Sequence, residues 1–195
     1  KVATRWGIIT ANAKWGNQIS VLTGDYLFSK AFSLVAQNPN SRIMSVLTDL
    51  ICAMSEGEII QNQEIFVPEM EESVYFTKIA KKTADFIAAS CELGAIMAEL
   101  STDEVEALRQ YGYCIGMAFQ ITDDILDITA TREKMGKPVG NDLLQGIVTL
   151  PTIYAMDNSV DKDELKQSVA TQKMTKKQLA RGLSIINETA AIKYS

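Results

Sequence analysis

The chain has 195 residues, of which 47% are hydrophobic and 22% charged, and its formal net charge is −5. These values are typical of a globular protein and exclude a disordered or low-complexity chain, and a chain of this length can bury a core of its own. The sequence contains no histidine, which excludes mechanisms that need an imidazole base, and its 19 Lys and Arg form no basic run that would indicate nucleic-acid binding.

Helical periodicity runs through almost the whole chain and predicts an all-α fold with a buried interior. Residues 19–35 are apolar on several faces and predict a buried helix that ends at the turn signal at residues 38–40. Ser41 is a candidate N-cap for a second helix. A third helix is expected to start at Pro68, with Gly94 marking a break or a close packing point.

The second half of the chain contains two capping-box patterns and one long loop. Ser101 and Glu104 predict the start of a long helix. Residues 129–148 contain three glycines and one proline and predict a loop of unusual length, and such loops usually carry function. Thr175 and Gln178 predict the start of a last helix. The expected core contacts of the long helix are Val105, Leu108, Ile115, Phe119 and Leu126.

The cysteines and the apolar runs indicate the cellular compartment of the protein. Cys52, Cys91 and Cys114 are far apart and have no metal-ligand spacing, so we expect buried, inert thiols in a reducing compartment. The longest apolar runs fall short of the roughly 18 residues that span a bilayer, and the start of the chain has no signal-peptide pattern. These features predict a cytoplasmic protein without a transmembrane segment.

The acidic residues near the end of the long helix are the strongest candidates for a functional site. At about 100° per residue, Gln120, Asp123 and Asp127 fall on one stripe of the helix, and Asp124 lies just beside it. Carboxylates this close repel one another, and magnesium, which prefers carboxylate oxygens and substrate phosphates, removes that repulsion. The pattern therefore favours a magnesium site, although a solvated helix end explains Asp-Asp-x-x-Asp in many helical proteins.

Lysines are candidates for binding a diphosphate near these carboxylates. Lys78 and Lys82 share one face of the third helix, and Lys137 lies in the glycine-containing loop after the long helix. A solvated basic face, paired with acids four residues away, explains the helical lysines without a ligand. Glu58 and Gln61 are either a polar helix end or an inward-facing hydrogen-bonding set.

Taken together and in order, these segments resemble the trans-isoprenyl diphosphate synthases, or polyprenyl synthetases. The resemblance covers nearly the whole chain, and the ordered set is highly specific although each motif alone is weak. Residues 12–32 resemble the bacterial medium- and long-chain synthases in particular. The matching segments are Trp15-Gly16, Gly24-Asp25-Tyr26-Leu27, Glu56-Gly57-Glu58 with Gln61, Lys82-Thr83-Ala84, residues 120–127, residues 136–143 and Thr149-Leu150-Pro151.

The resemblance implies an isoprenoid-synthase-like helical bundle around a deep central cavity. It implies condensation of isopentenyl diphosphate with an allylic prenyl diphosphate, head to tail, with Mg²⁺ as cofactor and release of diphosphate. Stabilising the charge of the departing diphosphate is electrostatic catalysis, which needs no histidine. The implied assembly is a homodimer, with a heterodimer as the alternative.

The same resemblance assigns roles to individual residues. Asp123, Asp124 and Asp127 match the family's second aspartate-rich motif, which holds magnesium against the allylic diphosphate. The positions that match those around the diphosphate and the departing group are Lys82, Thr83, Gln120 and Lys137, and Arg5 matches the first of an arginine pair that binds substrate. The catalytic set implied is Asp123, Asp124, Asp127, Lys82 and Lys137.

The sequence departs from the family pattern at three places. The first aspartate-rich motif is absent, Trp6 stands where the second arginine is expected, and Ile147 stands where the loop usually has another lysine. The chain also stops at Ser195, short of the helices that close the family's C-terminus. We therefore expect residues 1–195 to form a single helical domain that is incomplete at both ends relative to the family.

Several functions remain open from the sequence. The chain is part of an active synthase, or it is a catalytically deficient partner subunit of a heteromeric synthase, which Trp6 and Ile147 support. In both cases residues 1–195 alone should turn over substrate poorly, because magnesium binding from two sides is lost. A terpene cyclase and a pure interaction protein are further alternatives, and Lys82-Thr83 with the glycine-containing loop favours chain elongation over cyclisation.

Overall fold

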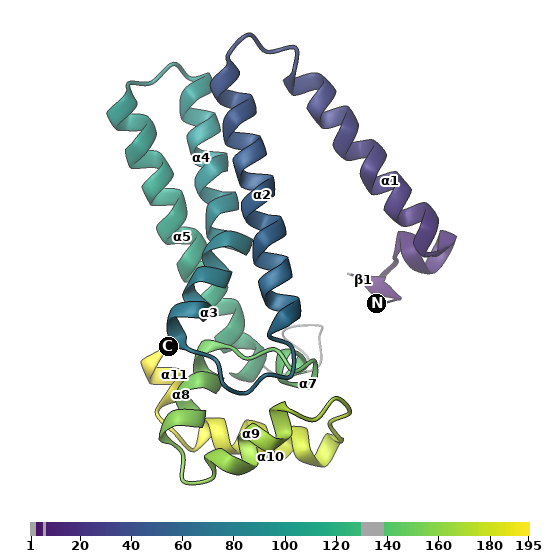
Figure 1. The fold of residues 1–195 in the computed structure, drawn as a ribbon, viewed down its shortest axis with the longest axis vertical. Coiled ribbons are helices and arrows are strands. Elements are labelled where there is room, and N and C mark those ends of the chain that lie inside the picture. Colours follow the sequence, from purple (N-terminus) through teal and green to yellow (C-terminus); the bar gives the residue numbers. More distant parts are fainter. Residues whose placement is uncertain (1–2, 6, 130–138) are drawn as a thin grey trace. The chain divides into compact units, whose positions relative to one another are not determined.

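The computed structural model describes residues 3–5, 7–129 and 139–195, and the regular structure within them is almost entirely helical (Figure 1). The predicted all-α fold is confirmed, since the two strands have two residues each and form one antiparallel pair. The chain divides into two compact units, Lys1–Leu47 and Thr48–Ser195. The elements are β1 (Thr4–Arg5), β2 (Ile8–Ile9), α1 (Ala11–Val35), α2 (Ser41–Gln63), α3 (Glu72–Ile79), the π-helical segment η1 (Ala80–Ala84), α4 (Asp85–Met97), α5 (Thr102–Thr129), α7 (Asn141–Leu144), α8 (Leu150–Asn158), α9 (Lys162–Val169), α10 (Lys176–Asn187) and α11 (Ala191–Tyr194).

In the first unit, α1 is an apolar helix that is not buried. The Thr10 side chain caps its N-terminus by accepting a hydrogen bond from the backbone N–H of Ala13 at 3.2 Å. None of the residues 11–35, all of which are described, is buried, and Trp15 is 58% exposed. The prediction of a buried helix over residues 19–35 is therefore wrong. Apolar periodicity identifies the faces that a helix can bury, but it contains no information about the surface that would cover them.

In the second unit, α3, η1 and α4 form one continuous helical run. The run begins at Glu72 rather than at Pro68, because Glu71 is still extended and forms the N-cap. Gly94 does not break it. The π-helical turn between α3 and α4 contains Lys82 and Thr83, and π-turns inside helices are frequent at functional sites.

The long helix α5 lies against η1 and α4, and a glycine permits the closest approach (Figure 1). A Cβ atom added to Gly116 would lie 2.5 Å from Cα of Ala84, a distance that real Cβ atoms do not adopt. Thr83 precedes Ala84 in the chain, and Gln120 lies about one turn after Gly116. This backbone contact therefore sets the separation of Thr83 and Gln120, two of the predicted site residues.

Both predicted capping boxes are confirmed. The backbone N–H of Ser101 donates to Oε2 of Glu104 at 2.9 Å, and the backbone N–H of Glu104 donates to Oγ of Ser101 at 3.4 Å. At the start of α10, the backbone N–H of Gln178 donates to Oγ1 of Thr175 at 3.3 Å, and the reciprocal bond is 2.9 Å long. The sequence signals for these two helix starts were local, so they did not depend on tertiary packing.

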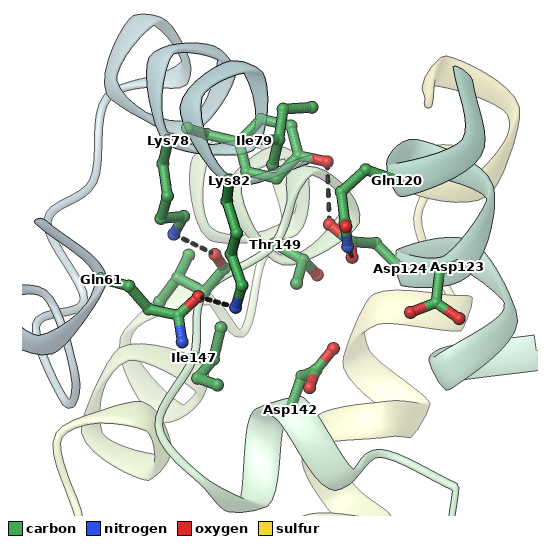
Figure 2. Close-up of a pocket in the computed structure, with 12 residues that line it drawn as sticks. Gln61, Lys78, Ile79, Lys82, Gln120, Asp123, Asp124, Asp142, Ile147 and Thr149 are labelled. Atoms are coloured by element: carbon green, nitrogen blue, oxygen red, sulfur yellow. Dashed lines mark hydrogen bonds between the residues drawn. The ribbon is translucent and has the colours of Figure 1, made fainter. Parts of the chain in front are cut away.

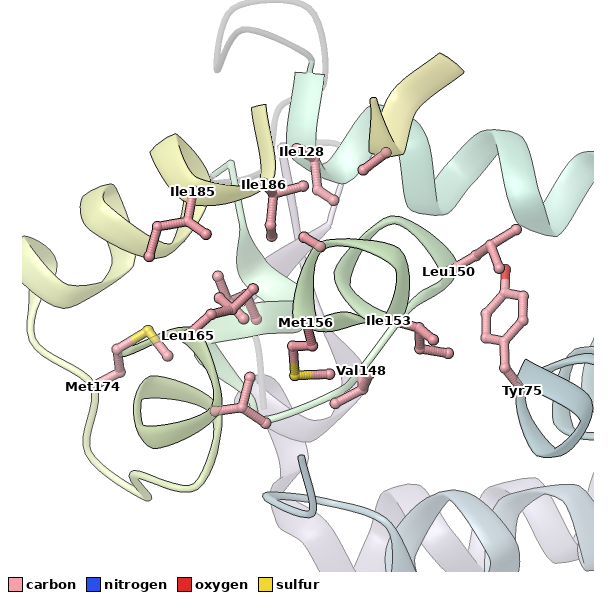
Figure 3. Close-up of a cluster of buried hydrophobic side chains, with 14 of the residues drawn as sticks. Tyr75, Ile128, Val148, Leu150, Ile153, Met156, Leu165, Met174, Ile185 and Ile186 are labelled. Carbon is pink, nitrogen blue, oxygen red and sulfur yellow. The ribbon is translucent and has the colours of Figure 1, made fainter. Parts of the chain in front are cut away.

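The hydrophobic core lies where α8, α9 and α10 pack on one another and on α3 and the end of α5 (Figure 3). Leu165 of α9 and Ile185 of α10 are fully buried in it. Tyr75 of α3 lies at one edge of this cluster, where Figure 3 shows it next to Leu150. Since Tyr75 also lines the site described below, the core fixes one wall of that site.

The predicted core contacts of α5 and the predicted burial of the cysteines are largely wrong. Among the five apolar residues expected in the core, only Val105 is buried, and the other four are 37–60% exposed. Cys52 and Cys114 are exposed, Cys91 is half-buried, and all three are free thiols. As in α1, the apolar pattern identifies residues that share a helix face but contains no information about whether another element covers that face. Within the described residues, none of the helices combines the length and the apolar character that crossing a membrane requires.

Candidate functional site

A pocket in the second unit brings together four of the predicted site residues and places opposite charges on its two sides (Figure 2). Its volume is about 240 Å³. Sites that enclose a drug-sized ligand measure roughly 300–1,000 Å³, so this pocket suits a small polar group better than a whole large ligand. It is lined by Gln61, Tyr75, Lys78, Ile79, Lys82, Gln120, Asp123, Asp124, Asp142, Ile147, Val148 and Thr149.

The carboxylate side of the pocket comes from two helices. α5 presents Gln120, Asp123 and Asp124 to the pocket. Of the predicted stripe of Gln120, Asp123 and Asp127, the first two line the pocket, and the neighbouring Asp124 lines it in place of Asp127. Asp142 extends from the first turn of α7 into the same space, toward the end of α5 (Figure 2). Asp142 was not among the predicted site residues, although it lies in the glycine-containing segment at residues 136–143 that resembles the family.

Asp124 is buried, with 4% of its surface exposed, and both of its oxygens accept hydrogen bonds. The Tyr75 hydroxyl donates to Oδ2 and the Gln120 side-chain amide donates to Oδ1, both at 2.8 Å. Gln120 in turn accepts a hydrogen bond from the Thr83 hydroxyl at 2.8 Å. A chain of hydrogen bonds therefore runs from Thr83 through Gln120 and Asp124 to Tyr75, and it links η1, α5 and α3.

The electrostatics of Asp124 reflect this burial. Desolvation, together with the charge of Asp123, raises the pKa of Asp124 to about 6, although the hydrogen bonds from Gln120 and Tyr75 favour the ionised form. Burial and the neighbouring Asp124 carboxylate also raise the pKa of Tyr75 above its usual value. The Tyr75 hydroxyl therefore stays protonated and remains a hydrogen-bond donor. The site contains a carboxylate whose negative charge would be stabilised further by a cation.

Asp127 does not line the pocket but holds the start of α7. Its side-chain oxygens accept hydrogen bonds from the backbone N–H groups of Asn141 at 3.3 Å and Asp142 at 3.0 Å. Its backbone carbonyl accepts a third from Gly140 at 2.7 Å. Unsatisfied N–H groups at a helix start favour such acceptors. Asp127 thus fixes the position from which Asp142 reaches the pocket.

η1 lies on the other side of the pocket, and its lysines form their pairs with side chains of α2 rather than with side chains of their own helix. The Lys82 ammonium donates to Oε1 of Gln61 at 2.6 Å and lies 3.8 Å from Glu58. Lys81 pairs with Glu56 at 2.5 Å. Lys82 is therefore not held by an acid four residues away, although the charge of Asp85, four residues along the chain, also acts on Lys81. Gln61 faces inward and lines the pocket, as the inward-facing alternative requires, whereas Glu58 is exposed.

Four of the predicted site residues are not placed in the lining of this pocket. Thr83 is connected to it only through its hydrogen bond to Gln120. Asp127 lies beside α7, as described above. Arg5 belongs to β1 in the first unit. Lys137 falls outside the described residues.

The pocket also contains Tyr75, which was not predicted as a site residue, and Lys78, which was placed on the same helix face as Lys82 but was not included in the predicted site. Tyr75 precedes Lys82 by seven residues in the same helical run, and this spacing would have identified a shared face.

Comparison with known proteins assigns the chain to a family. Its sequence matches the family profile described as Polyprenyl synthetase over residues 1–186. The chain belongs to the polyprenyl synthetase family. It is 40% identical over 193 residues to the heptaprenyl diphosphate synthase component 2 of Geobacillus stearothermophilus, covering 98% of this chain and 59% of that protein. It is 35% identical over 192 residues to the octaprenyl diphosphate synthase of Haemophilus influenzae, covering 98% of this chain and 58% of that protein.

Solved structures of polyprenyl synthetases share the fold. The heptaprenyl diphosphate synthase of Staphylococcus aureus superimposes with a TM-score of 0.90 at 31% identity, covering 99% of this chain and 60% of the other. A polyprenyl synthase of Caulobacter crescentus, solved with calcium and isoprenyl diphosphate, gives a TM-score of 0.89 at 31% identity and covers 98% and 59%. These likenesses confirm the predicted isoprenoid-synthase fold. The chain spans somewhat less than two thirds of the length of these relatives.

The acidic residues at the pocket fit a divalent cation as a partial donor set. Among the described residues, no three His, Cys, Asp or Glu side chains form a ready-made metal-binding group. Asp123 and Asp142 supply carboxylate oxygens at the pocket, beside the buried Asp124. Magnesium keeps several waters and takes one or two carboxylates together with phosphate oxygens, so such an open set suits it when a phosphate is present.

Proposed function

We propose that the chain provides the allylic-diphosphate side of a polyprenyl diphosphate synthase. The reaction is the head-to-tail condensation of isopentenyl diphosphate with an allylic prenyl diphosphate, with magnesium and with release of diphosphate. The observation that supports it best is the pocket in which Asp123, Asp124 and Asp142 face Lys78 and Lys82. Membership of the polyprenyl synthetase family and the names of its relatives support the same reaction.

In this proposal Asp123 would hold magnesium from the pocket. Asp124 and Asp127, the other two aspartates of the motif, would support this site from their positions next to Tyr75 and Gln120 and at the start of α7. When bound, the ion supplies charge stabilisation for the diphosphate as the bond to the allylic carbon breaks. Asp124 is already held by Tyr75 and Gln120, so it contributes a fixed negative potential without a change of conformation.

Lys82 binds the departing diphosphate from the opposite side. Its side chain is 42% exposed, so it can exchange Gln61 for a diphosphate oxygen without a change in the backbone. Gln120 borders the same space, and its hydrogen bond from Thr83 keeps it in place. Lys137 and Arg5 remain predicted contributors to substrate binding. No step requires an imidazole, in agreement with the absence of histidine.

The assembly is the second part of the proposal. The Geobacillus relative is called component 2 of its synthase, a name that favours a heteromeric partner over the homodimer expected from the family. A catalytically deficient subunit that needs such a partner is therefore the alternative function. The proposed location is the cytoplasm.

The first test is binding of farnesyl diphosphate, an allylic diphosphate, by the 195-residue chain. Isothermal titration calorimetry with magnesium should detect binding, and Asp123→Ala should weaken it at least about tenfold, the effect of removing a charged ligand. Lys81→Met is the matched control, because Lys81 pairs with Glu56 and does not line the pocket. If Asp123→Ala left magnesium-dependent binding unchanged, the proposed site would be wrong.

The second test is incorporation of radiolabelled isopentenyl diphosphate into a longer prenyl product. A terpene cyclase would not incorporate this label, so labelled product distinguishes elongation from cyclisation. We expect the 195 residues alone to incorporate it slowly, because the first aspartate-rich motif is not among them. Turnover at rates usual for the family would show that this motif is dispensable.

A further inference from the structure

Lys78 is a buried cation inside the charged pocket. It belongs to the last turn of α3, lies about one turn before Lys82, and is 4% exposed. Figure 2 shows the two lysines extending side by side into the pocket from the same helical run. A charged side chain this deeply buried needs close oppositely charged or polar partners.

The partners that the structure gives Lys78 are all distant. Its Nζ lies 3.4 Å from Oε2 of Glu64, 3.4 Å from the carbonyl oxygen of Val148 and 3.6 Å from Sδ of Met70. Charge-assisted N–H···O bonds are normally about 2.7–2.9 Å long. Oε2 of Glu64 is itself buried without a hydrogen bond of good geometry, so the Lys78–Glu64 pair is a long ion pair rather than a short charge-assisted bond.

The electrostatic surroundings of Lys78 agree with this geometry. Burial lowers the pKa of Lys78, and the charges of Glu64 and Asp124 only partly oppose that effect. Lys82 lies close enough to lower it further. An additional anion between the two ammonium groups would stabilise both.

Among the described residues that line the pocket, Lys78 and Lys82 are the only cationic ones. Residues 139–149, which form the wall opposite α3, contain no lysine or arginine, and Ile147 lines the pocket with an apolar side chain. The Lys78 ammonium reaches that wall at the carbonyl of Val148, the residue after Ile147. The second cation of the pocket therefore comes from α3 and lies next to a segment that contains no cationic side chain.

We propose that Lys78 is a second diphosphate-binding cation, which exchanges its long contacts with Glu64 and Val148 for a diphosphate oxygen beside Lys82. The inference rests on the proposed function of the pocket. It adds Lys78 to the diphosphate-binding residues and specifies where the diphosphate binds. The diphosphate then lies between Lys78 and Lys82 on one side and the carboxylates of Asp123 and Asp142 on the other.

The test measures binding of inorganic pyrophosphate with magnesium to the 195-residue chain by isothermal titration calorimetry. Lys78→Met is expected to raise the dissociation constant at least about tenfold, the usual effect of losing a hydrogen bond to a charged group. Lys78→Arg should retain most of the affinity, because it keeps the charge. Lys81→Met, a lysine of the same helical run outside the pocket, should leave the affinity unchanged.

Folding must be separated from binding, because Lys78→Met leaves the Glu64 carboxylate buried without a cation. The double variant Glu64→Gln, Lys78→Met removes both charges and should fold, as checked by circular dichroism, while still binding pyrophosphate weakly. If the folded double variant bound pyrophosphate like the wild type, the role of Lys78 would be overturned.

The outcomes also separate this inference from the proposed function. Wild-type binding that depends on Asp123 but not on Lys78 would overturn the inference and leave the proposed function intact. Absence of magnesium-dependent pyrophosphate binding by the wild type would overturn both.

Discussion

Substitution of Gly116 by alanine tests how closely the fold controls the site. The added methyl group would lie 2.5 Å from Cα of Ala84, whereas ordinary contacts begin at 3.4 Å, so α5 and η1 must separate by about 0.9 Å. The obstructing atom belongs to the backbone and cannot rotate away. Overpacking of this kind costs up to about 3 kcal/mol, and the helix propensity gained by replacing glycine offsets about 1 kcal/mol of it. We therefore expect a loss of about 2 kcal/mol in the free energy of unfolding.

Urea denaturation and thermal melting measure this effect, and a loss of about 2 kcal/mol corresponds to a melting temperature lower by about 4–8 °C. Gly94→Ala is the matched control, because Gly94 is also helical but nothing lies within 4 Å of its added Cβ. That variant should be as stable as the wild type or more stable by up to about 1 kcal/mol. Pyrophosphate binding should weaken in Gly116→Ala, since the same displacement stretches the 2.8 Å bond between Thr83 and Gln120. A Gly116→Ala protein as stable as Gly94→Ala would refute the reasoning.

Four further predictions follow from single contacts. Tyr75→Phe removes the hydroxyl that donates to buried Asp124 and should lower the free energy of unfolding by about 1.5–3 kcal/mol in urea titrations; an unchanged midpoint would contradict it. Asp127→Ala leaves the N–H groups at the start of α7 without their acceptor and should cost about 1–2 kcal/mol, with Asp127→Asn in between because it keeps one side-chain oxygen. Thr175→Ala deletes the cap of α10 and should cost about 1 kcal/mol, and equal stability would show that the capping box does not matter. Removal of magnesium with EDTA should weaken pyrophosphate binding at least about tenfold in calorimetry, because without the cation the pyrophosphate and the aspartate carboxylates of the pocket repel each other.

Local signals in the sequence predicted local structure well. The two capping boxes and the clustering of Gln120, Asp123 and Asp124 on one side of α5 follow from the chemistry of a few neighbouring residues, and the structure contains all of them. These features are determined by helix geometry alone, so no knowledge of the tertiary fold was needed.

Features that depend on distant segments could not be predicted in this way. Phe119 and Leu27 were expected to be buried because of the apolar pattern of their helices, yet both are more than half exposed, since burial depends on a covering surface that periodicity does not specify. Asp142 is separated from Asp123 by eighteen other residues, and Lys82 reaches Gln61 of another helix. Sequence spacing gives the position of a residue on its own helix but not which helix lies opposite.

The three aspartates of the motif, which look equivalent in the sequence, have different partners in the structure. Asp124 is fixed by Tyr75 and Gln120, and Asp127 is fixed by the first N–H groups of α7. Each of these two carboxylates accepts one hydrogen bond on each oxygen, which fixes its orientation and leaves it fewer of its roughly four lone-pair sites for a cation. Asp123 lines the open pocket, and no donor among the described residues is shown to hold it. On this argument Asp123 is the direct ligand, while Asp127 acts by placing Asp142, so a conservative change at Asp127 should affect stability more than ligand affinity.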